Sequence, residues 1–281
     1  MSVTRERFGA RLHAALAAHG PLCVGLDPHP HLLRAWGMGD DPSGLERFSR
    51  TVVEAVAGRV SAVKPQSAFF ERHGARGVAV LERVLEDLAG SGTVSILDAK
   101  RGDIGSTMEA YAQAYLAEGS PLAADALTVS PYLGYGSLRP AVELARASGR
   151  GVFVLALTSN PEGVATQHAG TPSVAARVVA GATRDNAGAT PMGDVGVVVG
   201  ATVGSAVEDL GLDLAGSGAP ILAPGVGSQG AQPADLARLF AGCTSRLVVP
   251  VSRGVLSAGP AAAQLSRRVA ELGDELRHAL G

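Results

Sequence analysis

Two carboxylates and one lysine ammonium group gather in the segment SILDAKRGDIGST, residues 95–107, where an apolar run ends. Asp98 and Lys100 are two positions apart, which on a strand places both side chains on one side, and Asp103 lies beyond the strand's end. At ordinary pKa values of about 3.9 and 10.4 all three groups are charged near neutral pH. A lysine between carboxylates is held protonated, so this cluster suits a proton donor better than a Schiff-base nucleophile. A salt-bridge network that ties one strand to its neighbour is the alternative.

Lysine is rare in this chain. Lys64 and Lys100 are its 2 lysines, against 22 arginines. Arginine keeps its proton at any working pH, whereas lysine is a compact ammonium group that can release it. Two sites that need a compact or releasable charge would explain the usage, and chance in an arginine-rich chain is the other explanation.

The segments APGVGSQG (223–230) and PVSRG (250–254) have the composition of an anion site. Glycines let backbone N–H groups approach an anion, and an arginine supplies a charged fork for phosphate oxygens. We therefore expect a phosphorylated substrate across the mouth of the site. Its phosphate would lie at Gln229, Ser252 and Arg253, and its reacting end near the charged cluster.

Short, β-branched apolar segments alternate with longer amphipathic ones along the whole chain, which is typical of βα units and a parallel sheet. The predicted strands cover residues 22–27, 60–66, 93–100, 126–131, 151–159, 195–202, 220–226 and 246–254. The predicted helices include residues 45–58, 75–90, 106–119, 233–242 and 260–280. The first two of these end at a glycine that can stop a helix.

Eight strands, each followed by a helix, predict one TIM (β/α)8 barrel that spans residues 1–281 as a single domain. An open doubly wound sheet is the alternative, but no G-x-G-x-x-G follows the first predicted strand. Polar residues fall at or just beyond the C-terminal ends of predicted strands, the face on which barrel enzymes build their active sites. These residues are Asp27, Lys64, Asp98, Lys100, Ser130 and Arg253.

Composition excludes several classes of protein. A net charge of -2 offers no basic field for nucleic acid or an anionic membrane. No apolar run reaches about 18 residues and the N-terminus lacks a signal-peptide core, so we expect a cytoplasmic protein without a membrane partner. Cys23 and Cys243 suit reduced core residues in a cytosolic protein. The histidines lack metal-ligand spacing, so we expect no metal site.

The sequence DAKRGDIGST resembles the D-x-K-x-x-D-I signature of the orotidine 5'-monophosphate decarboxylase family. VGLDP, VKPQSAFFE, TVSPYLG, PGVGSQGA and PVSRG are similar to its companion motifs, in the same order, from about residue 20 to 255. The sequences VKPQSAFFE and SPYLG are most similar to those of the longer bacterial branch of this family, type 2. The resemblance implies an enzyme that removes carbon dioxide from C6 of orotidine 5'-monophosphate to give uridine 5'-monophosphate, without metal or organic cofactor. This reaction is the last step of de novo UMP synthesis.

The resemblance also implies catalytic roles. Lys100 would stabilise the developing C6 carbanion and then protonate it. Asp98 would lie by the departing carboxylate, and Lys64 would complete the charged array and reach the ribose. Asp103 would come from the partner subunit of a homodimer, together with Ile104 and Thr107. The other implied substrate contacts are Asp27 at the ribose hydroxyls, Ser130 near the pyrimidine edge, Pro224 in the PGVGSQGA motif, and Gln229, Ser252 and Arg253 at the phosphate.

Two other functions fit parts of the pattern. One is a barrel enzyme with a similar motif that would act on a sugar phosphate through a metal-stabilised enediolate. Asp98 would then be among the magnesium ligands. Lys64 counts against a bound dication, because such a site would have a carboxylate at that position. A non-catalytic phosphate-binding barrel is the other alternative. Closure of a loop over the ligand would help any decarboxylase, and residues 158–170 and 181–194 are candidate lids.

Overall fold

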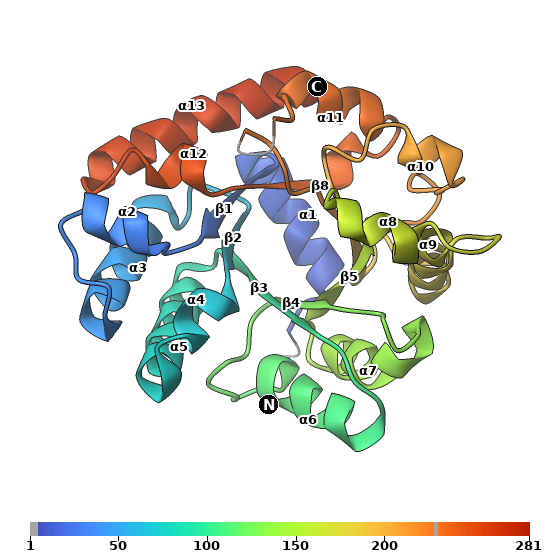
Figure 1. Ribbon diagram of the computed structural model, residues 1–281, viewed down its shortest axis with the longest axis horizontal. Coiled ribbons are helices and arrows are strands. Elements are labelled where there is room, and N and C mark those ends of the chain that lie inside the picture. The colour runs from blue at the N-terminus through green and yellow to red at the C-terminus, as the bar shows by residue number, and fades with distance from the viewer. Residues whose placement is uncertain (1–4, 228–229) are drawn as a thin grey trace.

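The computed structural model describes residues 5–227 and 230–281. Its strands form a closed parallel barrel, in which each strand is hydrogen-bonded to the next in chain order and β8 pairs with β1 (Figure 1). The strands are β1 (Leu22–Leu26), β2 (Ala62–Pro65), β3 (Val94–Arg101), β4 (Ala126–Val129), β5 (Gly151–Leu157), β6 (Val195–Val199), β7 (Ile221–Leu222) and β8 (Leu247–Val251). Each overlaps a predicted segment, and the predicted TIM barrel is confirmed.

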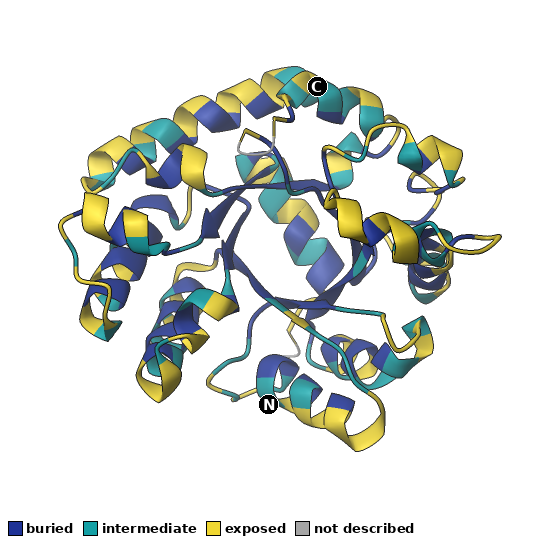
Figure 2. Cartoon of the chain, in the orientation of Figure 1, coloured by how far each residue is buried: buried dark blue, intermediate teal, exposed yellow. Residues whose placement is uncertain are grey.

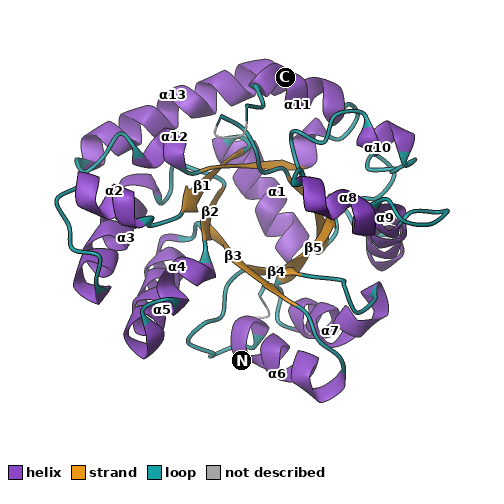
Figure 3. Ribbon diagram, viewed as in Figure 1, coloured by secondary structure: helices purple, strands orange, loops and turns teal. Residues whose placement is uncertain are grey.

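Helices surround the ring of strands (Figure 3). The α-helices are α1 (Phe8–His19), α2 (Pro30–Ala35), α3 (Pro42–Val56), α4 (Ser67–Glu71), α5 (Gly74–Ser91), α6 (Gly105–Leu116), α7 (Arg139–Ala147), α8 (Val164–Gln167), α9 (Val174–Asp185), α10 (Ala206–Asp209), α11 (Pro233–Leu239), α12 (Arg253–Leu256) and α13 (Ala262–Leu280). Short 3-10 turns, η1 (Tyr135–Leu138), η2 (Pro161–Gly163) and η3 (Thr244–Arg246), complete them. The five predicted helices match α3, α5, α6, α11 and α13.

The glycine predicted to stop the helix at 75–90 is the wrong one. Gly90 lies inside α5, and the helix runs on to Ser91. Gly92 stops it instead, because its φ of 73° is left-handed and its N–H donates to the carbonyl of Ala89.

The strands are buried on both faces, which is why they read as continuous apolar runs (Figure 2). One set of side chains points into the barrel and forms an inner cluster that includes Ala62, Ile96, Ala126 and Leu222. The other set packs outward against the helices and forms the larger core. Helix positions facing the strands are buried and their outer positions exposed, so the barrel is held by the apolar stripes of its helices.

Helix α1 closes the N-terminal end of the barrel. It is visible through the ring of strands in Figure 1, and its Phe8 and Leu12 belong to the inner cluster. The ring of Phe8 meets that of Phe153 edge-on, with 6.0 Å between the ring centroids. An apolar plug therefore fills this end of the barrel interior, and the interior is left open at the opposite, C-terminal end of the strands.

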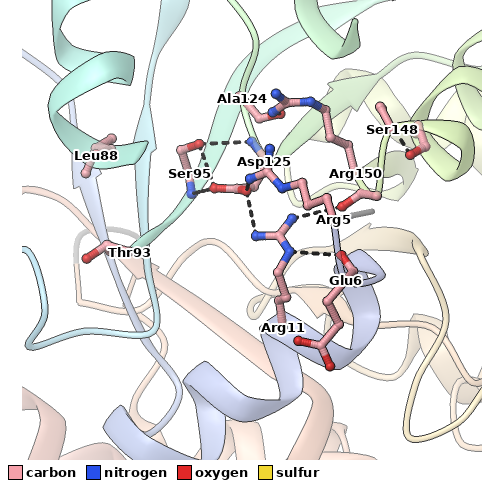
Figure 4. Close-up of polar contacts among 12 residues, drawn as sticks. Arg5, Glu6, Arg11, Leu88, Thr93, Ser95, Ala124, Asp125, Ser148 and Arg150 are labelled. Atoms are coloured by element: carbon pink, nitrogen blue, oxygen red, sulfur yellow. Dashed lines mark hydrogen bonds and ion pairs between the residues drawn. The ribbon is translucent and has the colours of Figure 1, made fainter. Parts of the chain in front are cut away.

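An ionic cluster ties the segment before α1 to the same closed end (Figure 4). The carboxylate of Asp125, which directly precedes β4, accepts hydrogen bonds from Arg5 and Arg11, the latter at 2.7 Å. The backbone N–H and the hydroxyl of Ser95 donate to its other oxygen at 2.8 and 3.0 Å. Burial raises the pKa of Asp125, but Arg11, Ser95 and Arg5 outweigh this and lower it below its ordinary value. The carboxylate is therefore ionised inside the fold.

Both cysteines, Cys23 and Cys243, are buried free thiols. Within the described residues, no helix is both long and apolar enough to cross a membrane. The cytoplasmic location stays a prediction.

Candidate active site

A buried carboxylate at the C-terminal end of the barrel binds both lysines of the chain. Nζ of Lys64, on β2, lies 2.8 Å from Oδ2 of Asp98, on β3. Nζ of Lys100 lies 2.5 Å from Oδ1 of the same residue. Both lysines of this lysine-poor chain therefore lie in one site, and each ammonium group binds its own oxygen of the carboxylate.

The charges in this cluster stabilise one another. Asp98 and Lys64 are only 8% and 6% exposed. Burial raises the pKa of Asp98, but Lys64 and Lys100 lower it far below the ordinary value. Burial lowers the pKa of Lys64, but Asp98 and Asp27 together raise it above the ordinary value. The side chain of Lys100 is 46% exposed, so its ammonium group reaches the open mouth of the barrel.

Strand β3 is irregular where the cluster forms. Leu97 pairs with Leu127 of β4, but the next paired residue on β3 is Arg101, opposite Val129. Between them Lys100 has a φ of 49°, and it is the one non-glycine residue with positive φ in the described part of the chain. Asp98 and Lys100 therefore meet through a bulge and not, as expected, through the alternation of a regular strand.

Sequence reasoning missed Thr128 of β4, which lies opposite this bulge. Its hydroxyl donates to Oδ1 of Asp98 at 3.0 Å and accepts the backbone N–H groups of Ala99 and Lys100, both at 3.0 Å. The available signal was a polar residue inside an apolar run, two positions before Ser130, which on a strand places both side chains on the same side.

Asp27, the residue after β1, has the properties of a ligand-binding group. Its Oδ1 is buried and has no hydrogen-bond partner among the described residues, although its charge acts on Lys64. A buried polar atom without a partner is costly, and a ligand hydroxyl is a suitable donor for it.

Asp103 does not join the cluster within one chain. Its Oδ1 accepts the N–H of Ile104 at 2.8 Å, and in the described ranges no ion pair links it to Lys100. Ile104 and Thr107 are exposed in the same loop and helix start. The expected cluster of Asp98, Lys100 and Asp103 therefore forms only in part within one chain. Asp98 and Lys100 meet, and the third charged group is Lys64 instead of Asp103.

The loops after β3 and β4 are joined at their base. The N–H of Ser130 donates to the carbonyl of Arg101 at 2.8 Å. A Cβ atom at Gly102 would lie 2.3 Å from the carbonyl oxygen of Ser130. The small residue at 102 therefore serves this backbone contact, and Ser130 is partly exposed at the mouth.

The residues expected at the phosphate follow β7 and β8, and β1 lies between β8 and β2, the strand of Lys64. Gly25 of β1 pairs in register with Lys64, and a Cβ at Gly25 would lie 2.0 Å from Oγ of Ser252. Arg253 begins α12 directly after Ser252 and is exposed, and Pro224 follows β7 at the same end of the barrel. Gln229 lies outside the described residues.

With this geometry the chain can be compared with known proteins. The model of the "Orotidine 5'-phosphate decarboxylase / HUMPS family" matches residues 20–267. The chain belongs to this family. A curated relative from Streptomyces coelicolor, named orotidine 5'-phosphate decarboxylase, is 56% identical over 279 residues, 98% of this chain and 99% of the relative. One of the same name from Salinispora arenicola is 57% identical over 263 residues, 92% and 93% of the two chains.

Solved structures agree with this assignment. A putative orotidine 5'-phosphate decarboxylase from Streptomyces avermitilis superposes with a TM-score of 0.94 at 56% identity, covering 99% of this chain and 97% of that one. The OMP decarboxylase of Leishmania donovani gives 0.76 at 30% identity, covering 98% and 99%. The predicted barrel and the predicted enzyme family, that of the orotidine 5'-phosphate decarboxylases, are both confirmed.

The two candidate lids lie at opposite ends of this decarboxylase-family barrel. Residues 158–170 follow β5 and carry η2 and α8, so they lie at the C-terminal end with the site. Residues 181–194 run from α9 into β6, which places them at the N-terminal end. There the carboxylate of Asp194 accepts the N–H of Gly9 at 2.8 Å and binds Arg7. The expectation of a lid at 181–194 is wrong.

Proposed function

We propose that this protein converts orotidine 5'-monophosphate into uridine 5'-monophosphate and carbon dioxide. The observation that carries the proposal is the buried Asp98, whose two oxygens bind Lys64 and Lys100 at the mouth of the barrel. Such an array of fixed charges is suited to a reaction in which a carboxylate leaves and a carbanion develops. Membership of the decarboxylase family supports the same reaction.

The proposed chemistry needs no electron-sink cofactor. The bond between C6 and the carboxylate breaks, its electron pair stays on C6, and carbon dioxide departs beside Asp98. The ammonium group of Lys100 stabilises the carbanion and gives it a proton, after which the neutral amine recovers a proton from water. Lys64 stays charged, completes the array and contacts the ribose. Support comes from the raised pKa of Lys64 and the exposed position of the Lys100 ammonium group.

Binding energy from the rest of the substrate has to contribute. Enzymes that reach about 10¹⁷-fold acceleration lower the barrier by roughly 23 kcal/mol. One oxyanion-type donor supplies only about 3 to 4 kcal/mol. The remainder is drawn from preorganised charge and from remote groups such as the phosphate. We assign the remote contacts to Asp27 at the ribose, Ser130 near the pyrimidine, and Pro224, Gln229, Ser252 and Arg253 at the phosphate end.

We also propose that the active site is completed in a homodimer, with Asp103, Ile104 and Thr107 entering the partner's site. The side chains of Ile104, Tyr132 and Leu133 are 62%, 81% and 53% exposed. They lie in the loops after β3 and β4, which the bond between Ser130 and Arg101 joins. Neighbouring exposed apolar side chains are typical of an association surface. The whole chain, residues 1–281, would act as one decarboxylase domain in each subunit.

The first experiment follows the loss of ultraviolet absorbance of orotidine 5'-monophosphate with purified protein, with and without EDTA. We expect EDTA-resistant turnover by the parent and none by Lys100→Ala. Arg76→Ala, which removes an exposed cation from α5, is the matched control and should keep parent activity. No turnover by folded parent protein would refute the decarboxylase. EDTA-sensitive turnover of a sugar phosphate would support the metal-dependent alternative, and phosphate binding without any turnover the non-catalytic one.

A further inference from the structure

Thr128 is the residue through which β4 holds the catalytic part of β3. It is fully buried. On β4, Thr128 is the single residue between Leu127 and Val129. On β3, the residues that pair with these two are separated by Asp98, Ala99 and Lys100. Three residues of one strand thus face one residue of the other. Backbone pairing between the strands is interrupted over this stretch, and the hydroxyl of Thr128 takes its place.

The hydrogen bonds of this hydroxyl define a single arrangement. A hydroxyl group has one proton to donate and two lone pairs. The N–H groups of Ala99 and Lys100 occupy both lone pairs at 3.0 Å, so the only proton goes to Oδ1 of Asp98, also at 3.0 Å. Asp98 then accepts from Thr128 and Lys100 on one oxygen and from Lys64 on the other. The same hydroxyl therefore connects the backbone of the bulge with the carboxylate.

The backbone of Lys100 needs such a support. A lysine at a φ of 49° is in the left-handed region, where its Cβ is crowded, and this conformation persists only when the surroundings fix it. The bond from Lys100 N–H to Thr128 fixes the strained residue itself. The same backbone conformation directs the ammonium group to Asp98 and the mouth of the barrel.

We propose that Thr128 is a positioning residue for the reaction: its hydroxyl holds the left-handed backbone of Lys100 and the Asp98 carboxylate in the one geometry that aims the ammonium group at the substrate. The inference rests on the proposed decarboxylation. Thr128 acts through Asp98 and Lys100 and leaves binding of the phosphate and ribose to other strands.

Thr128→Val removes the hydroxyl and keeps the shape of the side chain, and Thr128→Ser keeps the hydroxyl. Because misplacement of a reacting group by about 1 Å costs roughly 100-fold, we expect kcat of Thr128→Val to fall by about that factor. The dissociation constant of the product, uridine 5'-monophosphate, should stay within about 3-fold of the parent, a change below 1 kcal/mol at RT ≈ 0.59 kcal/mol. Thr128→Ser should restore kcat to near the parent value.

The matched control is Thr93→Val. The hydroxyl of Thr93 also accepts a backbone N–H, that of Gly58 at 2.8 Å, but Thr93 lies just before β3 at the other end of the barrel. Loss of this bond should lower thermal stability and leave kcat unchanged. If Thr128→Val behaves in the same way, with stability lowered and kcat of the folded protein unchanged, the positioning role is refuted and the hydroxyl is structural only.

Two further measurements keep the inference separate from the proposed function and from misfolding. Parent turnover is measured first, because its absence refutes the decarboxylase and not the role of Thr128 alone. If Thr128→Val does not fold, a crystal structure and kcat of Thr128→Ser decide. The proposal is supported if the serine hydroxyl still binds the two N–H groups and kcat is near the parent value. It is also supported if the hydroxyl has rotated away and kcat is reduced. A hydroxyl rotated away with unchanged kcat refutes it.

Discussion

Nζ of Lys64 and Oδ2 of Asp98 lie 2.8 Å apart, and both side chains are buried at the C-terminal end of the barrel. The pKa of Asp98 is lowered in the fold, so its ion pair stabilises the protein fully above the unfolded value of about 3.9 and is lost as pH falls toward the lower folded value. The pKa of Lys64 is raised, so its contribution is present below about 10.4 and is lost as pH rises through the higher folded value. The cluster is therefore intact over the whole neutral range.

Asp98→Asn tests this linkage. The substitution leaves the buried ammonium group of Lys64 without its nearest anion, which typically costs about 3 to 5 kcal/mol of unfolding free energy. We expect the difference from the parent, measured by urea denaturation, to be constant from about pH 5 to 9 and to shrink below about pH 4, where the carboxylate takes up a proton in the unfolded parent but not in the folded one. A difference that stays constant down to about pH 3 would contradict the lowered pKa.

Mixed dimers test the contribution of Asp103 across the interface. Lys100→Ala and Asp103→Asn are each expected to be inactive alone. In a mixed dimer, one site combines both substitutions and the other combines the intact Lys100 of one chain with the intact Asp103 of its partner. Random reassociation should therefore restore about a quarter of parent activity.

The control mixes Lys100→Ala with Asp98→Asn, two residues of the same chain and the same site. That mixture should stay inactive, since no subunit exchange brings an intact pair together. Restoration by the control mixture, or none by the test mixture, would contradict a shared site. Ultracentrifugation of Ile104→Asp adds an independent measure, because a charge in the exposed apolar surface should weaken the dimer.

The sequence alone was sufficient to predict the barrel and to single out the charged residues that meet at its C-terminal end. Strands buried on both faces keep continuous β-branched runs, so their positions are visible locally. Lys64 and Lys100 were distinguished by the scarcity of lysine. The local pattern also placed Asp27 and Ser130 correctly at strand ends, because those ends follow directly from the strand limits.

The geometry around Lys100 could not be predicted in this way. Its left-handed backbone depends on Thr128 of the neighbouring strand, a contact between residues 28 positions apart. The position of Asp103 relative to Lys100 depends in our proposal on a second subunit, which a single sequence does not display. The segment 181–194 was misassigned because glycine content indicates a loop but not the end of the barrel at which that loop lies.

Gly25→Ala tests the phosphate side of the site. Its new Cβ would lie 2.0 Å from Oγ and 3.1 Å from Cβ of Ser252, so the hydroxyl must rotate away and the Ser252 side chain must shift by a few tenths of an ångström. We expect KM for orotidine 5'-monophosphate to rise about tenfold, equivalent to about 1.4 kcal/mol of lost binding, with a smaller change for a nucleoside that lacks the phosphate. Gly90→Ala is the control, because no atom lies within 4 Å of its Cβ position. Equal losses for both ligands would argue against Ser252 as a phosphate contact.

Asp125→Asn separates stability from catalysis. Asp125 is buried like Asp98, but it pairs with Arg5 and Arg11 at the closed end of the barrel (Figure 4). Its removal should lower the unfolding free energy by about 3 to 5 kcal/mol, because arginine charges lose a buried partner. Asp87→Asn, which breaks an exposed pair with Arg50, should cost only about 0 to 1 kcal/mol.

The kinetic outcome of Asp125→Asn is expected to be the reverse of that of Asp98→Asn. Both substitutions remove one buried negative charge, so both should destabilise the fold, but only Asp98 binds Lys100, the residue to which we assign the proton transfer. Below the thermal transition, kcat of Asp125→Asn should therefore equal that of the parent, whereas Asp98→Asn should lose turnover. If kcat fell equally in both variants under conditions where each is folded, loss of activity at Asp98 would reflect general weakening of the barrel, and the catalytic role assigned to its charge would fail.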